Sequence, residues 1–121
     1  MEIILDTNIL IEILKNNQKT ILEVEKYDTH HISIITVMEL FYGAFNKIEL
    51  QKIKNFTELF NIIPLDESIS TIAKDLVYQY AKSHSLDIPD SLIASTALKM
   101  NLPLLSYNKK DFKFIDNLVL Y

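Results

Sequence analysis

Three acidic side chains stand just beyond predicted strands of this sequence. Asp6 follows the apolar run Ile-Ile-Leu, Glu39 lies a helical turn after the second predicted strand, and Asp90 begins the helix leading to the fourth. Two like charges 4 Å apart repel by about 4 kcal/mol at an effective dielectric of 20, so clustered carboxylates need a proton or a cation. Their hard oxygen atoms suit Mg²⁺ or Mn²⁺. The three acids predict a divalent-metal site, provided that the fold brings them together.

Each acid also has a purely structural explanation. Asp6 is a favoured residue type for a helix N-cap. Thr36 and Glu39 have the spacing of a capping box, in which the glutamate reaches back to the threonine backbone. Asp90 follows Pro89 at a helix start, where a negative charge complements the helix dipole. Capping and metal binding are compatible, since a helix N-terminus can hold an acid in place as a ligand.

Short apolar strands alternate with amphipathic helices along the chain. The predicted strands span residues 2–5, 31–35, 61–65, 104–106 and 118–121, and the predicted helices span 8–16, 19–27, 37–45, 49–60, 68–83 and 89–100. This alternation indicates one α/β domain over residues 1–121, with a mostly parallel sheet of four or five strands between two helical layers. In such sheets ligands bind beyond the carboxyl ends of the strands, which is where the three acids are expected.

Composition narrows the function classes. The 121-residue chain has a net charge of −4, so charge alone would not hold it on a nucleic acid. All of its basic residues are lysines, which excludes bidentate guanidinium contacts from this chain. It has no cysteine, and its N-terminal residues lack the pattern of a secretory signal. We therefore expect a cytoplasmic protein without disulfides or thiolate chemistry.

Four motifs, in order and nearly end to end, resemble those of PIN domains, and most closely the VapC-type toxin ribonucleases of prokaryotic toxin–antitoxin pairs. LDTNILI contains Asp6 and Asn8, ITVMELFYGA contains Glu39, IPDSLIASTAL contains Asp90, and LPLLSYNKKDF contains Ser106. No single motif is diagnostic, but their order and spacing together favour this family. The resemblance implies a PIN-like three-layer α/β/α sandwich.

The resemblance also implies a reaction and a set of roles. The reaction is hydrolysis of RNA phosphodiester bonds by an endoribonuclease that uses Mg²⁺ or Mn²⁺. Asp6 and Asp90 would bind the metal, and Glu39 would complete the catalytic group. The side chains expected to orient these carboxylates are Thr7, Asn8, Ser106 and Asn108. The implied partners are the RNA substrate, a cognate antitoxin that inserts a segment toward the acids, and a second copy of the chain.

One position departs from the family pattern. Asn108 stands where many PIN domains carry a fourth acid, which leaves three formal charges and predicts a weaker second metal site. Asp111 is assigned instead to a structural Asp-Phe pair with Phe112. Asp87, three residues before Asp90, is interpreted as a solvated loop acid.

Lysines and histidines near these motifs have separate expectations. Lys109, Lys110 and Lys113 form a local basic cluster that could contact RNA, although a solvated loop explains them about as well. None of the three histidines is assigned to catalysis.

Two rival functions remain open at this point. The first is a PIN-like module that binds RNA or protein with weak or no nuclease activity, in which Asn108 marks a degraded site. The second is an aspartate-based phosphotransfer protein, which also places acids after parallel strands. Against the second rival, Asp6-Thr7-Asn8 lacks the second aspartate of a phosphatase motif, and no lysine directly follows the fourth predicted strand.

Overall fold

The computed structural model describes all 121 residues as an α/β fold around a four-stranded, fully parallel sheet. The strands are β1 (Glu2–Leu5), β2 (Thr29–Ser33), β3 (Asn61–Ile63) and β4 (Leu104–Leu105), in the spatial order β3-β2-β1-β4. The α-helices are α1 (Thr7–Leu14), α2 (Gln18–Glu25), α3 (Ile34–Tyr42), α4 (Lys47–Thr57), α5 (Glu67–His84) and α6 (Ile88–Met100), and a 3₁₀ turn, η1, spans Lys109–Asp111. None of the helices is both long and apolar enough to cross a membrane.

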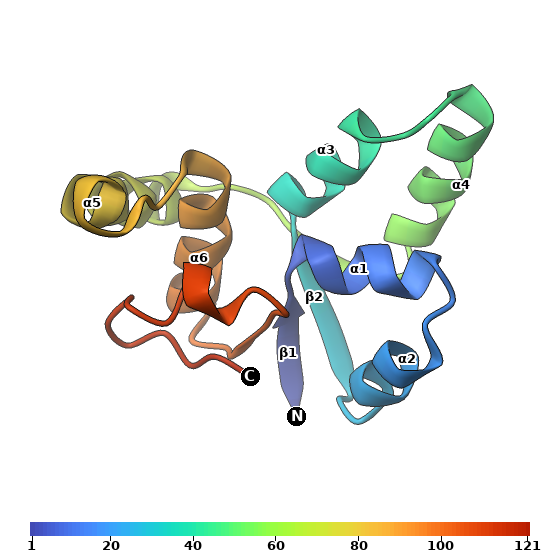
Figure 1. Ribbon diagram of the computed structural model, residues 1–121, viewed down its shortest axis with the longest axis horizontal. Helices are drawn as coiled ribbons and strands as arrows, with labels where there is room; N and C mark the ends of the chain where they lie inside the picture. Colours follow the sequence, from blue (N-terminus) through green and yellow to red (C-terminus); the bar gives the residue numbers. More distant parts are fainter.

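The predicted three-layer α/β/α arrangement is confirmed. Successive side chains of β1 point to opposite faces of the sheet, so Ile3 and Leu5 join one core while Ile4 joins the other. Helices α5 and α6 cover the Ile4 side, and helices α1 to α4 contribute to the opposite core (Figure 1). With both faces covered, the central strands need to be apolar throughout, which is the pattern that β1 has.

Polar side chains fix where every α-helix begins. The N-cap residues are Asp6, Asn17, Ser33, Asn46, Asp66 and Asp87, and each accepts a backbone N–H from the first turn of its helix. Two of these caps, Asp6 and Asp87, are acids that belong to or border the predicted site. The cap of Ser33 ends β2 two residues earlier than predicted, because Ile34 and Ile35 begin α3 instead of continuing the strand.

Two local predictions are corrected. Glu39 does not close a capping box on Thr36, because α3 begins before Thr36 and is capped by Ser33. The predicted fifth strand at 118–121 is reduced to a single bridge between Leu120 and Leu104. The backbone there still bonds to the β4 region, with Tyr121 N–H donating to Leu104 O at 2.9 Å.

The strand order changes direction between the neighbouring strands β1 and β4. From β1 the chain proceeds to β2 and β3 on one side and returns with β4 on the other. The carboxyl ends of β1 and β4 therefore form the switch point, where open parallel sheets usually bind ligands. Asp6 follows β1 at this point, and Ser106 follows β4.

A substitution of Phe112 tests the packing of the hydrophobic core beneath this edge of the sheet. Its side chain is 1% exposed among the buried residues of the α5–α6 side. Phe112→Ala should lower the free energy of unfolding by about 3–5 kcal/mol through lost burial and a cavity. Phe45→Ala is the matched control because Phe45 is 87% exposed, and a change within about 0.5 kcal/mol is expected there. Urea unfolding in which both variants lose equal stability would contradict this packing.

Candidate active site

Asp6 is the centre of a network of uncharged donors at the switch point. Its side chain is 5% exposed and accepts the Ser106 hydroxyl at 2.6 Å. It also accepts the Thr7 backbone N–H at 2.8 Å and the Asn8 amide at 3.2 Å. These bonds cap α1 and tie β1 to β4 across the gap, so the Asp6 carboxylate is held by dipoles without a neutralising cation.

Ser106 and Asn8 are themselves fixed by the chain that follows β4. The backbone N–H of Asn108 donates to Ser106 Oγ at 3.0 Å, and the backbone N–H of Tyr107 donates to Asn8 Oδ1 at 3.2 Å. Asn8 also lies 3.4 Å from Ser106 through its amide nitrogen. The structure thus places three of the four predicted orienting residues on Asp6, with Asn108 contributing its backbone.

Glu39 reaches the site from helix α3. Thr7 Oγ1 donates to Glu39 Oε1 at 2.7 Å, and it lies 3.0 Å from the hydroxyl of the fully buried Thr36. The sequence indicates only a capping role for Thr36, because its spacing from Glu39 is that of a capping box. The polar contact of two threonines from different elements, 29 residues apart, leaves no local pattern that could have revealed it.

Asp90 lies in the first turn of α6, whose N-cap is Asp87. The Asp87 carboxylate accepts the Asp90 backbone N–H at 2.9 Å. Asp87 is exposed, as predicted, but it is a capping residue whose charge also reaches the site. No ion pair or side-chain hydrogen bond involves the carboxyl of Asp90 itself.

The three predicted acids share one electrostatic neighbourhood. Burial raises the pKa of the Asp90 carboxyl to about 7. Other carboxylates add to this shift, in decreasing order Asp87, Asp6, Asp111 and Glu39. The charge of Asp111 therefore reaches the cluster, which its assignment to a structural pair did not anticipate.

The pKa values of the other two acids move in the same direction. Burial raises the pKa of Asp6, although the hydrogen bonds from Ser106, Thr7 and Asn8 oppose this change. Partial burial also raises the pKa of Glu39, which the Thr7 hydrogen bond lowers and the nearby charge of Asp6 raises. No lysine forms an ion pair with any of these acids. The cluster accordingly lacks a positive partner.

The chemistry of the acidic cluster suits the expected metal site, which stays a prediction. No group of three or more histidine, aspartate or glutamate side chains is arranged to hold a metal ion. The donor set nevertheless fits a hard cation: three carboxylates of raised pKa, without ion-pair partners, face one edge of the sheet.

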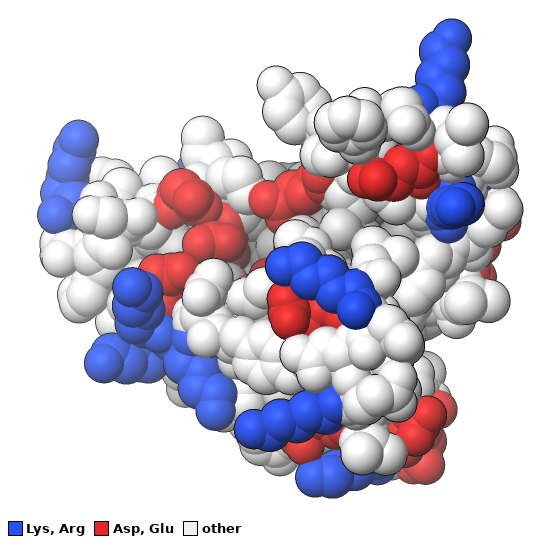
Figure 2. Space-filling view, turned by 45° about the vertical axis from the view of Figure 1, so that its right-hand side comes forward, with Lys and Arg blue, Asp and Glu red and all other residues white.

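The charged surface agrees with this arrangement. Acidic side chains gather between the two helical sides of the molecule, and lysines lie along the lower border of that patch (Figure 2). Lys109, Lys110 and Lys113 are all exposed, in or just after η1. They follow Asn108 and are thus on the strand-end side of the sheet.

The histidines belong to other parts of the fold. His31 is buried in β2, where Nε2 lies 2.7 Å from Glu2 and Nδ1 lies 2.7 Å from the Asn61 amide. His84 ends α5 and stacks on Phe114 with ring centroids 4.3 Å apart. Neither ring contacts the acidic cluster.

Comparison with known proteins identifies the protein family of this chain. The PIN domain profile matches residues 3–118. The chain belongs to the PIN domain family, and its curated relatives are VapC-type proteins.

Two curated relatives and two solved structures illustrate the likeness. "Ribonuclease VapC1" of Methanocaldococcus jannaschii is 34% identical over 93% of this chain and 79% of the relative. "Ribonuclease VapC" of Rickettsia bellii is 31% identical over 98% of this chain and 93% of the relative. Solved structures of VapBC2 from Rickettsia felis bound to a promoter DNA fragment and of VapBC-1 from nontypeable Haemophilus influenzae match with TM-scores of 0.84 and 0.83. These two structures are 31% and 30% identical in sequence to this chain. Each match covers 100% of this chain, and it covers 98% of the Rickettsia felis chain and 97% of the Haemophilus influenzae chain.

The raised pKa of Asp90 predicts how stability depends on pH without added metal. Between about 3.9, the unfolded value, and about 7, the folded protein retains a proton that the unfolded chain releases. The contribution of this group is therefore present at low pH and is lost as the pH rises through about 7. Asp90→Asn removes the group, so the variant should melt several degrees above the native chain at pH 8 and close to it at pH 4.

Thermal melts in EDTA measure this difference. The readout is variant minus native chain, because exposed carboxyls such as Asp66 have a lowered pKa and act in the opposite direction. Asp116→Asn is the control, since Asp116 is exposed and outside the cluster. An Asp90→Asn variant that is no more stable than the native chain at pH 8 would contradict the prediction.

Proposed function

We propose that this protein is a Mg²⁺- or Mn²⁺-dependent endoribonuclease that acts as the toxin of a toxin–antitoxin pair. One observation carries the proposal: Asp6, Glu39 and Asp90 all have a raised pKa, caused mainly by burial and increased by neighbouring carboxylates, and no lysine is paired to them. Support comes from relatives named Ribonuclease VapC at 31–34% identity.

In this proposal the residues have distinct roles. Asp6 and Asp90 hold the cation, which supplies an activated water molecule and neutralises charge on the scissile phosphate. Ser106 and Asn8 keep the Asp6 oxygen atoms in a fixed orientation. Thr7 orients Glu39, and the pKa of this carboxyl is raised above its ordinary value, which makes it a stronger base.

This chain has a surface next to these acids that suits a cognate antitoxin. A groove of about 680 Å³ runs between α1, α3 and α4, and Thr7 and Glu39 are among the residues that line it. Its apolar lining residues are Ile11, Leu14, Leu40 and Ile53. We infer that an apolar antitoxin segment occupies this groove and ends near Glu39. Solved neighbours of this fold are VapBC complexes, which supports a protein partner. The homodimer implied by the family resemblance stays a prediction.

A module without useful nuclease activity is the second candidate. Asn108 in place of an acid favours it. An aspartyl-phosphate function has no comparable support. The two remaining candidates differ in whether the native chain cleaves RNA when Mn²⁺ is added.

Cleavage of a labelled single-stranded RNA tests the proposal. The native chain should cleave in Mn²⁺ and not in EDTA, and Asp6→Asn should lower the rate by at least about 100-fold, since even weaker changes around metal ligands cost 10–100-fold. Circular dichroism should show an unchanged fold, because an asparagine can still accept the Thr7 N–H.

Two further variants separate the candidates. Asp116→Asn, at an exposed acid outside the cluster, should cleave as the native chain does. Asn108→Asp restores the fourth acid. Cleavage by Asn108→Asp alone, with an inert native chain, would favour the binding module. Native activity in EDTA, or full activity of Asp6→Asn, would refute the metal-dependent nuclease.

A further inference from the structure

A second, smaller pocket lies beside Ser106, between α2 and the residues that follow β4. It measures about 230 Å³, and its lining includes Lys19 of α2, Ser106, Tyr107, Lys109 and the C-terminal Tyr121. Ser106 belongs both to this pocket and to the Asp6 network. Any molecule that fills the pocket therefore lies next to the proposed reaction centre.

Tyr107 is an exposed ring that is held at both ends. Half of the residue is accessible to solvent, at 49%. Its hydroxyl lies 2.6 Å from that of the buried Thr20 in α2, and its backbone N–H donates to Asn8 at 3.2 Å. An exposed tyrosine usually has a mobile ring, whereas this ring is fixed before any ligand arrives. A preorganised aromatic face lowers the entropic cost of stacking.

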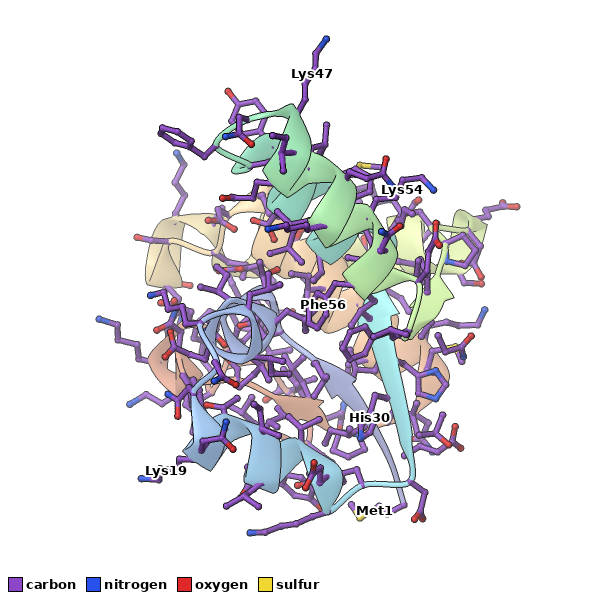
Figure 3. All side chains as sticks on the ribbon, turned by 90° about the vertical axis from the view of Figure 1, so that its right-hand side faces the viewer. Met1, Lys19, His30, Lys47, Lys54 and Phe56 are labelled. Atoms are coloured by element: carbon purple, nitrogen blue, oxygen red, sulfur yellow. The ribbon has the colours of Figure 1, made fainter.

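The same pocket is bordered by positive charge. Lys19 extends outward from the beginning of α2 (Figure 3), and Lys109 begins η1. Neither lysine forms an ion pair. The one acid of the lining, Glu23, is already paired with Lys26 at 2.8 Å. Two free ammonium groups beside an aromatic face are the combination by which proteins bind single-stranded nucleic acid.

We propose that this pocket binds one unpaired RNA base, stacked on Tyr107, with neighbouring phosphates contacting Lys19 and Lys109. The inference rests on the proposed nuclease function and adds a substrate requirement to it. Because Tyr107 directly follows Ser106, the stacked base belongs to a nucleotide beside the scissile phosphate. An RNA duplex does not offer such a free base, so the site selects single-stranded segments.

Equilibrium binding of a fluorescent single-stranded RNA in EDTA tests the pocket without cleavage. Tyr107→Leu removes the ring and should weaken binding by about 10-fold, within the range of stacking on one base. Tyr107→Phe keeps the ring and loses only the Thr20 contact, so it should bind within about 2-fold of the native chain. Tyr78→Leu is the matched control, since Tyr78 is 93% exposed on α5, and it should have no effect.

The lysines are tested by the salt dependence of the same binding. Replacing Lys19 and Lys109 together by glutamine should reduce the slope of log K against log salt by about 1.4, or 0.7 per lost phosphate contact. Replacing the exposed Lys47 and Lys74 by glutamine should leave the slope less changed.

The outcomes separate this inference from the function on which it rests. If Tyr107→Leu binds RNA as tightly as the native chain, and the native chain cleaves RNA in Mn²⁺, the proposed pocket is overturned and the proposed nuclease function stands. Equal losses in Tyr107→Phe and Tyr107→Leu overturn the stacking and assign Tyr107 a structural role through Thr20. A native chain that neither binds nor cleaves single-stranded RNA overturns both proposals.

Discussion

Carboxylates gathered without a positive partner are the constraint on which the arrangement of this molecule depends. Asp6 is nearly fully buried, yet its bonding partners are a hydroxyl, an amide and a backbone N–H. Such donors stabilise a carboxylate without cancelling its charge. The pKa is raised at all three acids, mainly by burial and further by neighbouring carboxylates. A site of this kind binds protons when free and exchanges them for a cation, which is the behaviour expected of a metal-dependent hydrolase.

The parallel sheet explains why these side chains meet. The strand order changes direction between β1 and β4, which forms the switch point. Residues that follow those two strands meet there through the Asp6–Ser106 hydrogen bond. Helices α3 and α6 then bring Glu39 and Asp90 to the same edge. The groove between α1, α3 and α4 and the Tyr107 pocket both border this centre, the first beside Glu39 and the second beside Ser106. We infer that partner and substrate reach the acids from different sides.

Much of this arrangement could be predicted from the sequence because apolar strand runs and polar strand ends are local signals. The layered fold follows from such signals, and the family follows from the resemblance of four motifs to those of PIN domains. The end of β2 was misplaced because Ile34 and Ile35 suit a strand as well as a helix, and the Ser33 side chain decides between them. The fifth strand was overestimated, since the apolar run before Tyr121 makes only one bridge.

Contacts between distant residues could not be predicted in the same way. The Thr20–Tyr107 hydrogen bond joins residues 87 positions apart, and the Thr7–Thr36 contact joins residues 29 apart. Neither pair has a spacing that marks it.

Calorimetric titration of the metal-free protein with Mn²⁺ at pH 6.5, in two buffers of different ionisation enthalpy, tests the central claim most directly. Asp90, with a pKa of about 7, is then largely protonated, so binding should release a large fraction of a proton per ion. Mn²⁺ that fails to bind, or that binds without releasing protons, would contradict a cation site built on these carboxylates.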